Sequence, residues 1–293
     1  MIEMIDRKPL IAALLVAALL SSAVAADQDQ ELTVFAAASL SVAFEEMGQL
    51  YKSNSTYRAI MNFDGSQMLR TQIEQGAYAD VFASANKKHM EALQAGGFID
   101  NSTVRPFLKN SLAVLLPKDN PGRIHNLSDL ARPGLRLVIG NSQVPVGQYS
   151  RQILDKMAED PDFGPEYRDR VLANVMSEET NVNLVVSKVA LGEADAGLAY
   201  ISDVSPKMTG QISTLPIPDR YNIVAEYYIG VLQGSRLPEQ AWQFIELVLS
   251  EQGQSVLKRH GFSPIGSSNL IQSAPGSQAD ILTRAAETAG AAA

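Results

Sequence analysis

The sequence contains no cysteine among its 293 residues, and only three histidines. The absence of cysteine excludes disulfide bonds, thiolate metal sites and a lipid-modified cysteine behind a signal peptide. No two of His89, His125 and His260 have the spacing of metal ligands, so we expect them at the surface or in capping roles. The sequence also lacks a P-loop, a dinucleotide-binding fingerprint and a G-x-S-x-G elbow, and therefore shows no motif of these enzyme classes.

Positive charge is scarce as well. The chain has 24 Lys and Arg against 32 Asp and Glu, and its formal net charge is -8. Such an acidic surface argues against nucleic acid or an anionic membrane as a partner. A small anion in a cleft is still possible, because local dipoles rather than net charge govern its binding. With 46% hydrophobic residues, the chain can bury a sizeable core, and its length predicts about two domains.

The sequence has a single long apolar run, at residues 9–20. It follows Arg7 and Lys8 and precedes the small-residue stretch "SSAVAA". This order predicts a signal peptide over residues 1–26, with cleavage after Ala25 or Ala26. The run is too short for a comfortable membrane span, although an N-terminal anchor is the alternative. We therefore expect a mature periplasmic protein without a lipid anchor.

Apolar strand patterns alternate with amphipathic helix patterns along the chain, which predicts an α/β fold with helices flanking each sheet. The expected strands cover residues 31–38, 57–63, 79–85, 110–118, 135–141, 170–176, 196–204 and 222–233. The expected helices cover residues 40–52, 66–76, 87–97, 147–160, 181–194, 239–250 and 253–261. The series restarts after residue 110 and predicts two lobes, the first formed by residues 27–110 plus 222–265 and the second by residues 111–221. The tail over residues 266–293, rich in Ser, Ala and Gly, is expected to be flexible and functionally silent.

Four junctions between a strand and the following helix share one property. Backbone N–H groups in the first turn of a helix have no intrahelical partner and lie at the positive end of the helix dipole. Such a helix start can bind an anion without a lysine or arginine. All four junctions follow strands, where open α/β sheets bind ligands, although each also reads as an ordinary helix cap. The candidate residues are Ser39, Ser66 with the preceding Gly65, Val146 after Pro145, and Val182 after Asn181.

Two of these junctions, those of Ser39 and Val146, lie within longer motifs. The segments "TVFAAASL", "ADVFASANKKHMEAL", "NSLAVLLPK", "VPVGQY", "ALGEADAGLAY" and "LSEQGQSVLKRHGF" stand in this order along the chain. Over residues 31–264 the sequence resembles the periplasmic molybdate-binding proteins of ABC importers. The resemblance implies a two-lobed, type II periplasmic-binding-protein fold with two chain crossings at the hinge. It further implies a monomeric receptor, not an enzyme, that needs no cofactor and delivers molybdate or tungstate to a membrane permease.

The resemblance also implies a set of neutral donors that hold the metal as its oxyanion, with no protein ligand to a metal cation. These are the hydroxyls of Ser39, Ser66 and Tyr200 and the backbone N–H groups of Ala85, Val146 and Val182. Four of the six coincide with the helix starts found above. Ala85 and Tyr200 are assigned by the resemblance alone.

One departure from the family pattern concerns "FDGSQ", where many relatives have a serine pair and this chain has Gly65 beside Asp64. A carboxylate in the pocket would repel a dianion and could accept a proton from hydrogen phosphate. Alternatively, Asp64 points to solvent or pairs with a cation. A receptor for sulfate or phosphate is therefore the main alternative function. A secreted hydrolase with Ser39 as nucleophile is a weaker one, because no histidine lies at the end of a predicted strand.

Overall fold

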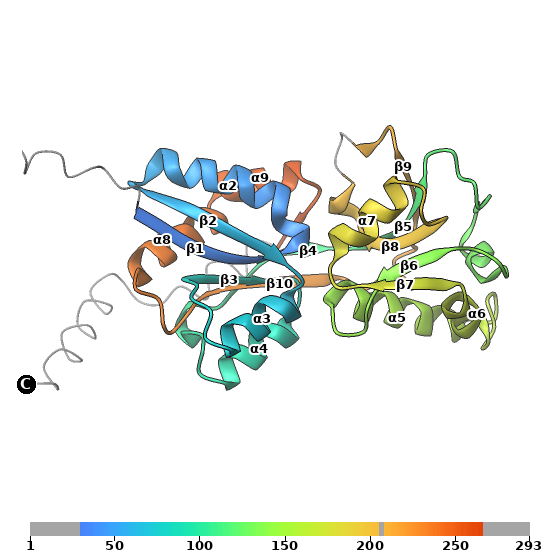
Figure 1. The fold of residues 1–293 in the computed structure, drawn as a ribbon, viewed down its shortest axis with the longest axis horizontal. Helices are drawn as coiled ribbons and strands as arrows, with labels where there is room; N and C mark the ends of the chain where they lie inside the picture. The colour runs from blue at the N-terminus through green and yellow to red at the C-terminus, as the bar shows by residue number, and fades with distance from the viewer. Residues whose placement is uncertain (1–29, 205–207, 266–293) are drawn as a thin grey trace, which may run out of the picture.

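The computed structural model describes residues 30–204 and 208–265. The expected signal peptide (1–26) and the expected tail (266–293) lie outside these residues. Figure 1 shows two lobes side by side, each with a sheet and helices on both of its faces, which confirms the predicted α/β class.

The first lobe is built on a six-stranded sheet with the order β11-β4-β10-β3-β1-β2. Its strands are β1 (Gln30–Ala37), β2 (Tyr57–Asp64), β3 (Val81–Ser84), β4 (Arg105–Asn110), β10 (Ala225–Val231) and β11 (Ser263–Pro264). β1 pairs in parallel with β2 and β3, whereas β10 runs antiparallel to β3 and β4. The carboxyl ends of β1, β2 and β3 therefore meet at one edge of the sheet, which faces the second lobe (Figure 1).

The second lobe is built on a five-stranded sheet with the order β7-β6-β8-β5-β9. Its strands are β5 (Leu112–Pro117), β6 (Leu137–Gly140), β7 (Val175–Glu179), β8 (Ala196–Tyr200) and β9 (Ile212–Pro216). β6 pairs in parallel with β7 and β8, and β5 runs antiparallel to β8 and β9. Both sheets thus combine a parallel half with antiparallel strands next to the hinge.

The helices cover the two sheets. They are α2 (Ser41–Asn54), α3 (Ser66–Glu74), α4 (Lys87–Ala95), α8 (Pro238–Leu249) and α9 (Glu251–Arg259) in the first lobe, and α5 (Pro145–Ala158), α6 (Tyr167–Ala173) and α7 (Val182–Ala190) in the second. Short 3-10 turns are η1 (Ala38–Leu40), η2 (Asn101–Thr103), η3 (Leu127–Ala131) and η4 (Ile201–Asp203). None of the helices in the described part of the chain has the length and apolar character needed to cross a membrane.

The described chain passes between the sheets twice, from β4 to β5 and from β9 back to β10. Asn222 ties the two crossings together, because its side chain accepts a hydrogen bond from the Leu112 N–H (3.1 Å) and donates one to the Leu112 carbonyl (2.8 Å). Such side-chain bonds to backbone hold the two crossings together at the hinge.

The fold differs from the sequence-based expectation at several strands, since β9 and β11 are not among those expected. The strand expected over residues 170–176 is wrong over its first part, because residues 170–173 belong to α6, and the strand begins at Val175. The segment forms a helix rather than a strand because Tyr167 and Val171, four positions apart, both bury their side chains on one face of the helix. β4 was not expected as a separate strand, since Pro106 lies inside it and proline is typical of strand edges and bulges. The register of β4 against β10 shifts at this point, which accommodates the proline.

Candidate functional site

The first junction leads from β1 through η1 into α2. Ser39 lies in η1, and α2 begins at Ser41, one residue later than expected. The Ser39 side chain does not cap either helix. Its buried Oγ lies 2.8 Å from the hydroxyl oxygen of Tyr227 on β10, and either group can be the donor. The serine hydroxyl is therefore held in place by the core of the first lobe, at the edge that faces the second.

The second junction leads from β2 into α3, with Gly65 as the N-cap and Ser66 as the first helical residue. Ser66 is fully buried, and its Oγ accepts a hydrogen bond from the backbone N–H of Ala85 (3.0 Å). A serine hydroxyl can accept and donate at once, so its own proton remains available for a ligand. In this structure the Ala85 N–H, expected as a direct donor, is committed to Ser66.

The second lobe contributes the first turns of α5 and α7. Pro145 occupies the first position of α5, and Asn181 caps α7 by accepting a hydrogen bond from the Leu184 N–H (3.2 Å). Within the described chain, the backbone N–H groups of Val146 and Val182 have no hydrogen-bond partner. Two positive helix ends with free donors thus face the first lobe.

Tyr200 ends β8, and its side chain is almost completely buried. No partner for its hydroxyl is found among residues 30–204 and 208–265. Burial, followed by the nearby phenol group of Tyr227, raises the pKa of the Tyr200 phenol well above its ordinary value. The group therefore stays protonated and is a neutral donor. A buried hydroxyl without a partner is costly, which indicates a place prepared for an acceptor.

The six residues expected to bind the ligand all line one small cavity between the lobes. Its walls are formed by Ala37, Ala38, Ser39, Gly65, Ser66, Ala85, Val144, Pro145, Val146, Asn181, Val182 and Tyr200. None of these side chains is charged. The cavity has a volume of ≈ 20 Å³, which is room for about one water molecule. It suits a small, compact ligand surrounded by donors.

Asp64 is not among the residues that line this cavity. Its Oδ1 accepts hydrogen bonds from the Gly65 N–H (2.7 Å) and from the Asn181 side-chain amide (3.0 Å) in the other lobe. Asp64 is half-buried and its carboxylate is bound by neutral donors, so the expected pairing with a cation is wrong, and so is the alternative that its carboxylate lines the pocket. Sequence reasoning missed this contact because its partners lie 117 positions apart.

His89 is the one histidine whose expected surface or capping role is wrong. It lies in α4, is buried, and its Nε2 is 3.2 Å from the carbonyl of Gln143 in the second lobe. A carbonyl can only accept, so Nε2 carries the proton, and Nδ1 is left without a partner in the described part of the chain. Asn86 nearby makes a longer contact with Gln148, 3.4 Å, across the same boundary. His89 is thus part of the contact between the lobes.

The buried state of His89 predicts a loss of stability in acid. Burial, followed by the positive charge of Arg70, lowers the pKa of His89 from 6.5 to about 4. The unfolded chain then binds a proton below pH 6.5 that the folded chain does not take up until about pH 4, so the free energy of unfolding falls over this window. We expect a loss of about 1–3 kcal/mol, after allowing for solvent screening.

The replacement His89→Gln tests this expectation, because glutamine can still donate to Gln143 but does not titrate. Urea unfolding of wild type and variant at pH 7 and pH 4.5 should show a smaller pH difference for the variant. Equal pH differences for the two proteins would contradict the assignment.

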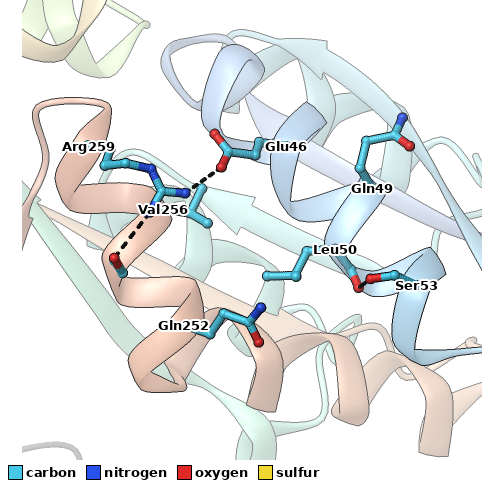
Figure 2. Close-up of a pocket in the computed structure, with 8 residues that line it drawn as sticks. Glu46, Gln49, Leu50, Ser53, Gln252, Val256 and Arg259 are labelled. Carbon is cyan, nitrogen blue, oxygen red and sulfur yellow. Dashed lines mark hydrogen bonds and ion pairs between the residues drawn. The ribbon is translucent and has the colours of Figure 1, made fainter.

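A larger hollow, ≈ 540 Å³, lies on the surface of the first lobe between α2 and α9. Figure 2 shows Glu46 on α2 paired with Arg259 on α9 across it. Glu46 also contacts Nε2 of His260 (2.8 Å), and these two contacts lower the pKa of the Glu46 carboxyl. The charged groups of this hollow are thus already paired, whereas the donors of the cavity between the lobes are not. We therefore take the smaller cavity as the candidate site.

Comparison with known proteins identifies the family of the chain. The profile of the family described as bacterial extracellular solute-binding protein matches residues 32–263. The "Molybdate-binding protein ModA" of Mycobacterium tuberculosis is 34% identical over 80% of this chain and 85% of the relative. The solved substrate-binding domain of a putative molybdenum ABC transporter from Clostridium difficile is 26% identical, with a TM-score of 0.60, over 80% of this chain and 99% of that one.

A third similar structure is the sulfate-binding protein SubI of Mycobacterium tuberculosis. Its TM-score is 0.72 at 15% identity, over 83% of this chain and 90% of that one, so the likeness concerns the fold. The family profile spans nearly all of the described residues, including both lobes and every junction that contributes to the cavity. The chain therefore belongs to the family of bacterial extracellular solute-binding proteins.

Proposed function

We propose that this protein captures molybdate or tungstate in the periplasm and delivers it to an ABC permease, without any cofactor. The observation that carries the proposal concerns an uncharged cavity. It holds the Tyr200 hydroxyl and the N–H groups of Val146 and Val182, none of which has a hydrogen-bond partner among the described residues. The hydroxyls of Ser39 and Ser66 complete a ring of neutral donors drawn from both lobes. Such a ring can surround one tetrahedral oxyanion.

Hydrogen bonds alone can supply the binding energy. A hydrogen bond to a charged group contributes about 1.5–3 kcal/mol, so five or six preorganised donors can hold a dianion without a salt bridge. The absence of a cationic side chain also leaves the geometry of the donors as the main determinant of selectivity. A ring set for the long metal–oxygen bonds of molybdate or tungstate would hold sulfate loosely.

The relatives support the ligand and the route. The named relative in Mycobacterium tuberculosis is a molybdate-binding protein, and the Clostridium difficile structure is the substrate-binding domain of an ABC transporter. A permease in the membrane is therefore the partner we propose. The expected signal peptide and the lack of cysteine support a mature periplasmic protein without a lipid anchor.

A receptor for sulfate is the second candidate, favoured by the likeness in fold to the sulfate-binding protein. Hydrogen phosphate fits less well, because its own proton needs an acceptor. The cavity has no carboxylate in its walls, and the nearby Asp64 is engaged by Gly65 and Asn181. The donor set therefore favours a fully deprotonated dianion.

A hydrolase with Ser39 as nucleophile has the least support. A serine nucleophile needs a base within hydrogen-bond reach. Among the described residues, Ser39 Oγ is hydrogen-bonded to the hydroxyl of Tyr227, which is the group that would have to serve as the base. Burial raises the pKa of that phenol, so it stays protonated and cannot act as a base.

The test is a thermal unfolding screen of the ligand-free protein with molybdate, tungstate, sulfate and phosphate. A ligand at a hundred times its dissociation constant stabilises the folded state by about 2.7 kcal/mol, which should raise Tm by several degrees at this size. We expect a shift with molybdate and tungstate. A shift with sulfate and none with molybdate would favour the second candidate, and no shift with any oxyanion would contradict the proposed function.

A further inference from the structure

We propose that Asp64 is a positioning residue that holds the start of α7 over the anion cavity. Together with Gly65 and Gln67 of the first lobe and Thr180 and Asn181 of the second, it forms what we call the interlobe latch. The latch acts on the site of the proposed function and so rests on that function for its effect on affinity. Its effect on the closure of the lobes is independent of any ligand.

Two hydrogen bonds define the latch. Asp64 Oδ1 accepts from the side-chain amide of Asn181 (3.0 Å), and the Gln67 side-chain amide donates to the carbonyl of Thr180 (2.9 Å). The first-lobe partners lie where β2 passes into α3, and the second-lobe partners lie where β7 passes into α7 (Figure 1). Two adjacent residues of the second lobe are therefore hydrogen-bonded to one short segment of the first lobe.

The contact with Asp64 also selects the orientation of the Asn181 amide. Because the NH₂ group points to the carboxylate, the amide oxygen is turned to the Leu184 N–H, which it caps at 3.2 Å. With the cap satisfied in this way, the Val182 N–H stays free in the wall of the cavity. The negative charge of Asp64 beside the start of α7 is also favourable to the helix dipole.

Gly65 permits the close approach that the latch requires. A Cβ atom at this position would lie 2.4 Å from the Thr180 carbonyl oxygen and 2.5 Å from the Gln67 side-chain oxygen. Any larger residue would therefore push Thr180, and with it the second lobe, away. Asp64 and Gly65 act as a pair, in which the glycine lets the lobes meet and the carboxylate holds them.

All partners in the latch are protein groups, so the latch stabilises the closed form even before an anion binds. A larger closed population raises the apparent affinity, since the observed dissociation constant is the intrinsic one divided by the competent fraction. The latch is thus expected to tighten binding without contacting the anion.

The first test places two carboxylates against each other. In N181D, aspartate can still cap α7, but its charge faces that of Asp64. In the double variant D64N/N181D, the amide and carboxylate exchange sides and the hydrogen bond can form again. The chain has no cysteine, so A95C and E159C, at exposed positions on the two lobes, allow a fluorescence pair to report their separation.

Without anion, we expect N181D to open the lobes and the double variant to close them again. Titration calorimetry with molybdate should show affinity at least tenfold weaker for N181D. The double variant should recover only part of that loss, because its carboxylate at position 181 lies in the cavity wall and repels the dianion. An unchanged separation in N181D, or a double variant that stays open, would overturn the proposal. If wild type fails to bind molybdate, the proposed function fails, and the separation still decides whether the latch exists.

The second test is G65A, with G234A as the matched control. A Cβ atom added at Gly234 would have no heavy atom within 4 Å, and this glycine needs no left-handed backbone. We expect G65A to widen the separation and weaken molybdate binding at least tenfold, and G234A to change neither. Equal behaviour of the two variants would overturn the role of Gly65.

Discussion

Replacing Val182 with proline is expected to weaken molybdate binding about 10- to 150-fold while leaving the ligand-free fold intact. The substitution deletes the backbone N–H that faces the cavity, and a hydrogen bond to a charged group contributes about 1.5–3 kcal/mol. Val182 is the first residue of α7, the position at which proline is best tolerated in a helix. The preceding Asn181 already has the extended backbone (φ -153°, ψ 166°) that a following proline requires.

Val182→Ala is the matched control, because it keeps the N–H and removes most of a buried side chain. We expect V182A to lower Tm and to bind molybdate like wild type. The two variants thus separate the backbone donor from the packing of the valine. Calorimetry and thermal unfolding of both proteins provide the measurement, and wild-type affinity in V182P would remove Val182 from the site.

Most of the site residues could be predicted from sequence signals that mark the start of a helix. Ser39, Ser66, Val146 and Val182 stand at the ends of strands, next to capping residues or a proline, and these local signals mark the first turn of a helix. Ala85 also stands next to a capping residue, Asn86, but it precedes that cap, so its N–H lies outside the first turn of α4. The structure adds that its N–H reaches Ser66, a contact between segments 19 positions apart that no local pattern indicates.

Contacts between the lobes could not be predicted for the same reason. Asp64 and Asn181 meet only because two sheets, each built from non-adjacent segments, present their strand ends to each other. A carboxylate next to a glycine in a sequence is equally typical of a solvent-exposed turn. His89 is similar, since its ring contacts the carbonyl of Gln143 in the other lobe, 54 positions away.

The uncharged cavity also bears on how the protein releases its ligand. With donors divided between two lobes, an oxyanion is fully surrounded only when the lobes are closed. Opening removes the donors of one lobe at once, among them Val146, Val182 and Tyr200. A permease that separates the lobes would therefore weaken binding by several hydrogen bonds without having to compete with a salt bridge.

Replacing Tyr200 with phenylalanine is expected to have opposite effects on binding and on stability. The variant removes a donor to the anion, so affinity for molybdate should fall about 10- to 150-fold. In the ligand-free protein it removes a buried hydroxyl that has no partner in the described part of the chain. Because such a group costs about 1–3 kcal/mol, we expect the variant to have a Tm a few degrees above that of wild type.

Tyr167→Phe is the control for this prediction. Tyr167 is equally buried in the second lobe, but its hydroxyl donates to the Leu127 carbonyl at 2.5 Å. Removing that bond should lower Tm and leave the affinity unchanged, the reverse of the result expected for Y200F. A Y200F variant that loses stability as Y167F does would show that the Tyr200 hydroxyl has a structural partner. The phenol would then be part of the core, and the anion would be held by Ser39, Ser66 and the helix starts alone.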